Sequence, residues 1–150
     1  MKTKQLVGSG DKIMGFTFPF ALAGIILNIV YPHWFKMNIG VTGIIIGTAL
    51  LVLGVPFWLL SVVQMAIYVP KNKLITKGAF LIMQHPIYTS VALLVIPGLS
   101  FVFDTWVGLT IGVILYLISR FFRVQEERKL DDVFSEEYKT YRSKIIIPWV

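Results

Sequence analysis

Two segments of the chain carry most of the side chains that are suited to chemistry. Residues 73–88 read KLITKGAFLIMQHPIY and include His85, whose imidazole titrates near neutral pH and can take part in proton transfer or anion binding. Residues 120–141 read RFFRVQEERKLDDVFSEEYKTY and include the adjacent carboxylates Glu126 and Glu127. Neighbouring residues lie about 100° apart on a helix, so only one of these carboxylates can face a given pocket.

The composition excludes several other kinds of site. The chain has no Cys and only two His, His33 and His85, so it has no disulfide, no thiol nucleophile and no zinc site of Cys and His ligands. We therefore expect no bound metal. The formal net charge is +6, but the basic residues flank apolar runs and form no patch with interleaved aromatic side chains. We therefore expect no nucleic-acid partner.

The amino-acid composition is that of a membrane protein. Apolar residues make up 56% of the chain without counting Gly, and the mean hydropathy is +0.75. Soluble globular domains reach only about 45–50% apolar residues even when Gly is included. We predict a single all-α domain over residues 1–150, a polytopic membrane helix bundle whose partner is the lipid bilayer.

Four apolar stretches are the predicted transmembrane helices, at about residues 13–35, 39–69, 87–103 and 105–122. At 1.5 Å per residue, the first is long enough to cross a hydrocarbon core of roughly 30 Å. The second is interpreted as one tilted or kinked helix containing Pro56, because two helices and a turn do not fit its length. Small residues along one of its faces permit close helix packing, namely Gly40, Gly43 and Gly47.

The last segment, at about residues 123–143, is too charged to lie in lipid, yet it carries an apolar stripe. A spacing of three or four residues places on one helix face Leu130, Val133, Phe134, Tyr138 and Tyr141. We predict a cytoplasmic amphipathic helix that lies against the bundle or the membrane interface, with a solvated tail as the alternative.

Lys and Arg are distributed unevenly between the predicted loops. The N-terminus has three, the first connection one, the second three, the third none and the C-terminal segment seven. With four spans and both termini in the cytoplasm, 13 of the 14 cations lie on the cytoplasmic side, in agreement with the positive-inside rule. We therefore predict a multi-pass integral membrane protein with both termini cytoplasmic.

The position of His85 follows from the proline after it. Pro86 favours an extended residue before it and a new helix directly after it, so we expect His85 at the start of the third span. Free backbone N–H groups at such a position favour negative ligand groups. A histidine at a membrane boundary is also typical of an interfacial anchor, so the position alone does not assign a role.

The two segments together resemble one known family, the isoprenylcysteine carboxyl methyltransferase and phospholipid methyltransferase family of integral membrane enzymes. The resemblance covers about Leu74 to Pro148, half of the chain. The residues in register with the family's two-part signature are Gly78, Phe80, His85, Pro86, Tyr88, Glu126, Glu127, Leu130, Phe134, Tyr138, Tyr141 and Pro148.

The chain departs from the family pattern at two positions. The family usually has Arg before the His-Pro pair, and this chain has Gln84, so a cation is missing there that Lys73, Lys77 or Arg123 would have to supply. Where the family often has Gly after the Phe, this chain has Ser135. A left-handed backbone at Ser135 would carry strain.

The resemblance implies S-adenosylmethionine as the cofactor and methyl transfer at the cytoplasmic membrane face. The implied acceptor is lipophilic, either the carboxylate of a prenylcysteine-like compound or a lipid head group. A carboxylate at Glu126 suits the ribose hydroxyls or the amino group of the cofactor, and His85 suits its carboxylate. The rings of Phe80 and Tyr88 suit the adenine or the sulfonium.

The full set of cofactor-binding residues that the resemblance implies is Gln64, Asn72, Lys73, Leu74, Ile75, Phe80, His85, Pro86, Ile87, Tyr88, Glu126 and Glu127. Residues 72–75 are expected to supply backbone contacts. Arg123, three residues before Glu126, is the expected ligand of an anionic acceptor. No catalytic group is assigned, because in-line methyl transfer requires alignment and exclusion of water more than acid–base chemistry.

Two other functions stay open at this point. Some sterol and steroid reductases have a similar C-terminal helical arrangement, so a membrane reductase using NADPH is one alternative. The other is a non-enzymatic membrane scaffold protein whose charged tail binds a partner. The lack of charged residues deep in the spans disfavours a proton relay, an ion channel or a coupled transporter.

Overall fold

The computed structural model describes residues 9–148, and the structural statements below refer to that part of the chain. Within it all regular elements are helical, and extended pairing is limited to two isolated bridges, Lys36 with Thr105 and Met83 with Ile147. The prediction of an all-α protein is confirmed for these residues. Lys2 and Lys4, which count toward the predicted cytoplasmic N-terminus, lie outside the described residues.

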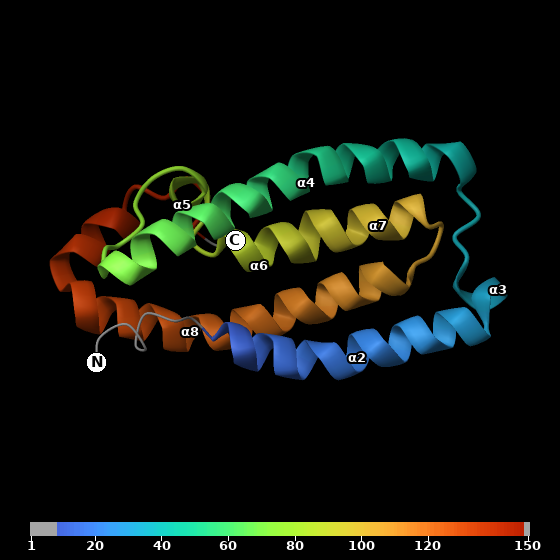
Figure 1. Ribbon diagram of the computed structural model, residues 1–150, viewed down its shortest axis with the longest axis horizontal. Coiled ribbons are helices and arrows are strands. Elements are labelled where there is room, and N and C mark those ends of the chain that lie inside the picture. The colour runs from blue at the N-terminus through green and yellow to red at the C-terminus, as the bar shows by residue number, and fades with distance from the viewer. Residues whose placement is uncertain (1–8, 149–150) are drawn as a thin grey trace.

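Four helical rods lie side by side along the long axis of the molecule (Figure 1). One rod combines three short elements, α6, the π-helical turn η2 and α7. Short elements at the ends of the rods are α3, the 3₁₀ turn η1 and α5. The elements are α2 (Gly10–Val30), α3 (Pro32–Phe35), α4 (Gly40–Tyr68), η1 (Val69–Lys71), α5 (Ala79–Ile82), α6 (Pro86–Ser90), η2 (Val91–Val95), α7 (Ile96–Val102) and α8 (Val107–Arg142).

Three helices of the described chain are long and apolar enough to cross a membrane: Gly10–Val30, Gly40–Lys71 and Val107–Arg142. The α6–α7 rod, Pro86–Val102, is a shorter apolar helix. The second predicted span is one helix that contains Pro56, as expected. The helix begins at Pro86, as predicted, and His85 before it is non-helical, although its φ of −123° and ψ of 61° are not the fully extended conformation expected.

The C-terminal part differs from the prediction in one respect. No boundary separates a fourth span from an amphipathic helix near residue 122, because α8 continues to Arg142. Helix α8 has 36 residues, and the 28 before Ser135 alone are about 42 Å long, so they extend well beyond a hydrocarbon core of roughly 30 Å. The helix is interrupted instead at Ser135, whose φ of 42° and ψ of −108° are the strained positive-φ conformation anticipated there.

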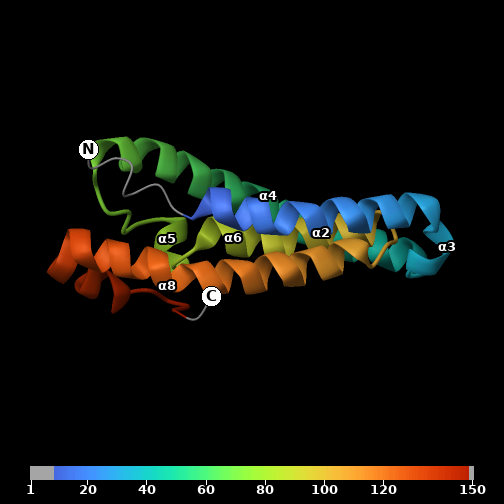
Figure 2. The same cartoon turned by 90° about the horizontal axis from the view of Figure 1, so that it is seen from below.

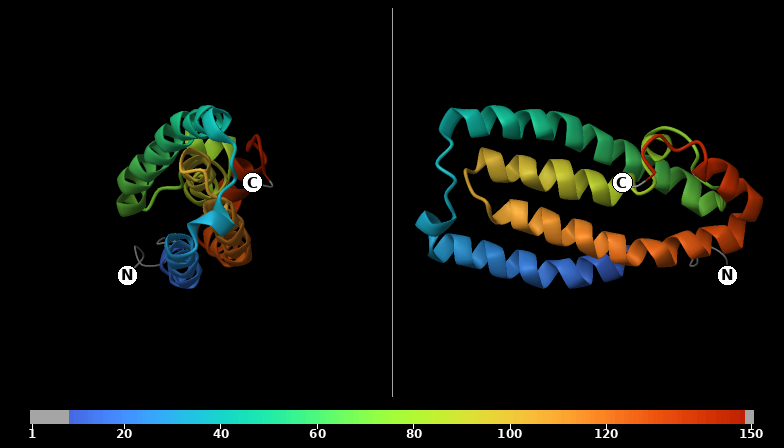
Figure 3. Two further views of the ribbon diagram at one scale, coloured as in Figure 1. Left: turned by 90° about the vertical axis from the view of Figure 1, so that its right-hand side faces the viewer. Right: turned by 180° about the vertical axis from the view of Figure 1, so that it is seen from behind.

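The rods pack in a fixed order that puts the α6–α7 rod at the centre (Figure 3). It contacts α4 on one side and α8 on the other, and α2 packs along α8. A buried cluster joins α2, the α6–α7 rod and α8, formed by Ile13, Ala92, Leu115 and Phe122. The outer faces of the rods carry exposed large apolar side chains, such as Phe18 and Ile45, as expected for contact with lipid.

Two of the three glycines predicted on one face of α4 allow α7 to approach. A Cβ on Gly47 would lie 2.6 Å from the Gly98 carbonyl oxygen, and one on Gly43 would lie 3.0 Å from that of Phe101. Gly54 packs in the same way against Leu94 of η2. Gly40 has a different role, because it begins the helix with a φ of +54° and has open space around its Cβ position.

The loop after η1, α5 and the end of α8 meet at one end of the bundle, opposite α3 (Figure 2). A second buried cluster holds them together, formed by Tyr138, Tyr141 and Ile145, with Leu74, Leu130 and Phe134 against it. Most of the apolar stripe predicted for residues 123–143 is therefore packed inside the protein. Val133 is the exception, with 43% of its surface exposed.

The close contact of α4 with α7 makes one position sensitive to a single methyl group. We expect Gly47→Ala to lower the thermal stability in detergent, because overpacking costs about 1–3 kcal/mol. Gly15→Ala is the matched control, since that glycine is also helical and has nothing within 4 Å of its Cβ position. The control should be neutral or slightly stabilising because Ala favours helix more than Gly. Equal melting temperatures for the two variants would contradict the packing.

Candidate functional site

A cavity of about 120 Å³ lies at the end of the bundle where the two signature segments meet. Its walls come from the end of α4, the loop before α5, the start of the α6–α7 rod and the polar part of α8. Nine of the twelve residues predicted to bind the cofactor line it: Lys73, Leu74, Ile75, Phe80, His85, Pro86, Ile87, Tyr88 and Glu126. Segments far apart in the sequence thus form one cavity.

The other predicted residues lie near the cavity but not in its wall. Gln64 fastens the loop before α5, because its amide donates to the Lys77 carbonyl at 2.9 Å and accepts from the Ala79 N–H at 3.1 Å. Asn72 makes the turn after η1 with a φ of 52°. Glu127 points away from the cavity, as expected for a residue next to Glu126 on a helix.

Several cavity residues were not assigned to the cofactor site from the sequence. Met65 comes from the end of α4, Val69 begins η1, and Gln84 precedes His85. The remaining ones lie on α8 and are Lys129, Leu130, Phe134 and Tyr141. Lys129 and Leu130 follow Glu126 by three and four residues and Phe134 follows Leu130 by four, so helical spacing was the available signal for these three. Tyr141 lies beyond the interruption at Ser135, so this spacing does not place it.

His85 lies between the two carboxylates of α8 and connects them. Its Nδ1 is 3.2 Å from Glu126 Oε2, and its Nε2 is 3.9 Å from Glu127 Oε1. Burial lowers the pKa of His85, but the contacts with Glu126 and Glu127 outweigh burial and raise the pKa above its ordinary value. Within the described residues Nε2 has no hydrogen-bond partner, so one ring nitrogen is unpaired.

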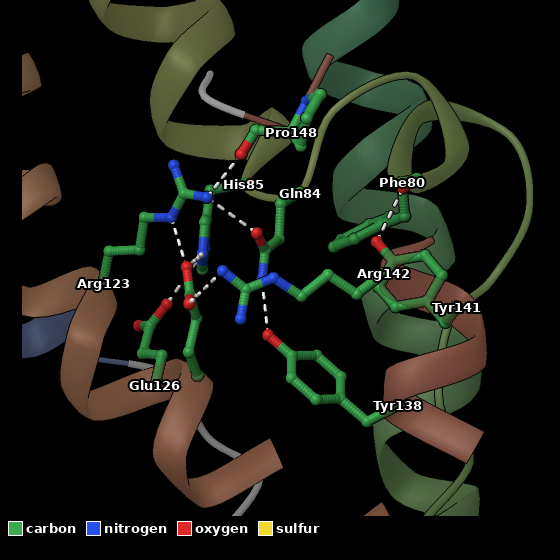
Figure 4. Close-up of polar contacts among 10 residues, drawn as sticks. Phe80, Gln84, His85, Arg123, Glu126, Tyr138, Tyr141, Arg142 and Pro148 are labelled. Carbon is green, nitrogen blue, oxygen red and sulfur yellow. Dashed lines mark hydrogen bonds and ion pairs between the residues drawn. The ribbon is translucent and has the colours of Figure 1, made fainter. Parts of the chain in front are cut away.

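Arg123 joins three parts of the chain beside this histidine, namely α8, Gln84 and Pro148 (Figure 4). Its Nε donates to Glu127, one turn further along α8. Its Nη2 donates to Gln84 Oε1 at 2.8 Å and to the Pro148 carbonyl at 2.5 Å. Arg142 adds a second cation to Glu127, at 3.6 Å. The guanidinium of Arg123 is therefore already engaged, and it lines a separate, much smaller cavity.

Gln84, the residue that departs from the family pattern, belongs to the same network. Its amide NH₂ donates to the hydroxyl of Tyr138, while its carbonyl oxygen accepts from Arg123. Gln84 is 4% exposed, so an arginine there would bring a second buried cation against Arg123. Gln84 therefore suits this chain, because Arg123 already places a cation here and Tyr138 accepts a hydrogen bond from the Gln84 amide.

On the other side of the site, the residues after α8 form hydrogen bonds to α5. Backbone N–H groups of Ile146 and Ile147 donate to the carbonyls of Leu81 and Ile82, at 3.1 and 2.9 Å. The hydroxyl of Tyr141 donates to the Phe80 carbonyl at 2.6 Å. These hydrogen bonds hold the main chain of α5, which carries Phe80, beside the cavity.

The fold and the cavity define a class of protein. Mostly apolar walls, with a His85–Glu126 pair among them, lie at one end of an apolar helix bundle, an arrangement that suits a membrane enzyme acting on an amphipathic compound. No group of three or more potential metal ligands occurs in residues 9–148.

Comparison with known proteins gives the family. Residues 37–131, well over half of the chain, match the isoprenylcysteine carboxyl methyltransferase family, and the chain belongs to it. Membership implies a membrane methyltransferase. The match ends before Phe134 and the residues that follow it in the second signature segment. No curated protein and no solved structure matches the chain.

The network around Arg123 predicts a large loss of stability when the cation is removed. Arg123 and Glu127 are only 12% and 17% exposed, so Arg123→Met leaves a buried carboxylate short of its main partner. We expect the unfolding free energy to fall by about 3 kcal/mol.

The matched control is Lys139→Met, which breaks an ion pair with Glu136 whose side chains are 63% and 86% exposed. Exposed pairs contribute about 0–1 kcal/mol, so the control should unfold almost like the wild type in urea or thermal melts. A similar small effect for both variants would show that the Arg123 network does not stabilise the fold.

Proposed function

We propose that the protein transfers a methyl group from S-adenosylmethionine to a lipophilic acceptor at the cytoplasmic membrane face. The observation that carries the proposal is the cavity in which the two signature segments of a methyltransferase family meet. In that cavity the Glu126 carboxylate and the His85 imidazole lie among apolar and aromatic side chains. This combination suits a polar cofactor and an apolar acceptor side by side.

The cofactor would be held by residues of both segments. Glu126 would accept hydrogen bonds from the ribose hydroxyls or the amino group, and charge makes such bonds about twice as strong as neutral ones. His85 and the first N–H groups of the Pro86–Val102 helix would face the carboxylate. Phe80 and Tyr88 would offer aromatic faces to the adenine or the sulfonium. Residues 73–75 would contribute backbone contacts.

S-adenosylmethionine supplies a methyl group that its sulfonium already activates. Held by these residues, it would give up that methyl group to a lone pair of the acceptor, and the electron pair of the broken carbon–sulfur bond would stay on sulfur. The protein therefore has to align the two reactants and exclude water. Cavity walls made of Leu74, Ile75 and Phe134 suit exclusion of water.

The acceptor is proposed to be a carboxylate of a prenylcysteine-like compound or a lipid head group. Arg123 can bind its anionic group only by giving up one of its present partners, which are Glu127, Gln84 and the Pro148 carbonyl. The structure thus favours a positioning role for Arg123. Lys73 and Lys129 line the cavity and are the better placed cations.

The proposed topology has four crossings and both termini in the cytoplasm. The Pro86–Val102 helix would be the fourth crossing, and its 17 residues span about 25 Å, a small mismatch that local thinning of the bilayer accommodates. The segment from η1 to α5, which carries Lys71, Lys73 and Lys77, lies at the same end of the bundle as the basic end of α8 (Figure 1). The residues that line the cavity come from these parts of the chain and from the start of the α6–α7 rod. The positive-inside rule assigns that end to the cytoplasm.

The proposal predicts cofactor binding that depends on Glu126. Purified protein in detergent should bind S-adenosylhomocysteine in isothermal titration calorimetry, and Glu126→Ala should weaken binding at least tenfold because a charge-assisted bond is lost. Glu136→Ala removes an equivalent carboxylate that is 86% exposed, and it should bind like the wild type.

NADPH serves as the comparison ligand for the reductase alternative. Binding of NADPH but not of S-adenosylhomocysteine would overturn the proposal in favour of a reductase. Equal affinities of wild type and Glu126→Ala for S-adenosylhomocysteine would remove Glu126 from the site.

A further inference from the structure

Ser9 contacts the candidate cofactor site from a part of the chain that the signature segments do not include. It precedes α2 and is only 6% exposed. Its backbone N–H donates to Glu126 Oε1, across 117 residues of sequence. The Ser9 side chain also interacts favourably with the Glu126 carboxylate. The N-terminal helix is therefore tied directly to the acidic group of the cavity.

The carboxylate of Glu126 is held at both oxygens by different elements. Ser9 engages Oε1, and His85 Nδ1 lies 3.2 Å from Oε2. A free glutamate side chain loses rotamer freedom when it is fixed, and this loss opposes binding. Because these two contacts fix it before any ligand arrives, a ligand that uses Glu126 has less ordering to do.

Ser9 acts through Glu126 and not through the cavity itself. Glu126 lines the cavity wall, whereas Ser9 does not. The next residue, Gly10, packs against a second cavity residue, since a Cβ on Gly10 would lie 3.3 Å from the Tyr88 hydroxyl oxygen. Ile13, 1% exposed, anchors this first turn of α2 in the main buried cluster. The start of α2 thus supports two cavity residues from behind.

We propose that Ser9 is a positioning residue, which holds the Glu126 carboxylate in the orientation that the methyl donor requires. This inference rests on the proposed function, because it gives Glu126 a role toward that cofactor. The start of α2 would then help to position a cofactor-binding residue, in addition to the packing of this helix along α8.

Three substitutions separate the backbone hydrogen bond of Ser9 from the contribution of its side chain. Its φ of −72° lies in the range of proline, so Ser9→Pro removes both the N–H and the hydroxyl without distorting φ. Ser9→Ala removes the hydroxyl alone, and Ser9→Thr keeps both groups. For S-adenosylhomocysteine we expect roughly tenfold weaker binding in Ser9→Pro, roughly threefold in Ser9→Ala and no change in Ser9→Thr.

Two further variants distinguish positioning from general weakening of the fold. Gly24→Ala crowds α2 against Val107 at 3.1 Å, at the far end of the same helix pair, and should leave the affinity unchanged. In the Glu126→Ala background, Ser9→Pro should cause no further loss of affinity, because the group it positions is gone.

The outcomes separate the inference from the proposed function. Wild-type protein that does not bind S-adenosylhomocysteine overturns the proposed function and, with it, the inference. Wild-type binding that is retained in full by Ser9→Pro overturns the inference alone. The inference is also overturned if Gly24→Ala weakens binding as much as Ser9→Pro does, or if Ser9→Pro weakens it equally without Glu126.

Discussion

The contact between His85 and Glu126 is the interaction on which the site depends. His85 stands at the start of the central rod and Glu126 on α8, so their 3.2 Å contact joins the two signature segments at one end of the bundle. Burial alone would make a charged pair costly, and the cost is offset only when further partners satisfy the remaining polar atoms. Ser9 provides such a partner for Glu126, and Arg123 and Arg142 do so for Glu127.

The apolar bundle gives this polar cluster a fixed frame. Close packing of α4 on α7 through Gly43 and Gly47, and on η2 through Gly54, sets the position of the central rod, and α2 packs along α8 on the other side. The residues after α8 then fold back onto α5 through main-chain hydrogen bonds. The chain has few polar side chains, and several of those in the two signature segments lie together at the cavity. Methyl transfer would require the methyl donor and the acceptor to be aligned there.

Residue types and spacing predicted much of this arrangement. The all-α class, the single helix through Pro56 and the helix start at Pro86 are local consequences of hydropathy and proline chemistry, and the structure has them. The continuation of α8 past residue 122 was not predicted, because the change from apolar to charged residues near Phe122 marks a change of environment and not a change of backbone. The contacts of Ser9 and of Gln84 depend on segments far apart in sequence, which no local pattern encodes.

The central claim is that the chain moves a methyl group onto a lipophilic acceptor, and isotopic labelling tests it most directly. Membranes containing the protein are incubated with S-adenosylmethionine labelled in its methyl group, and the lipid extract and the membrane proteins are analysed by mass spectrometry. The account predicts a labelled lipophilic species that is absent from membranes carrying Glu126→Ala. Absence of any labelled species with the wild-type protein, or equal labelling with both, would contradict it.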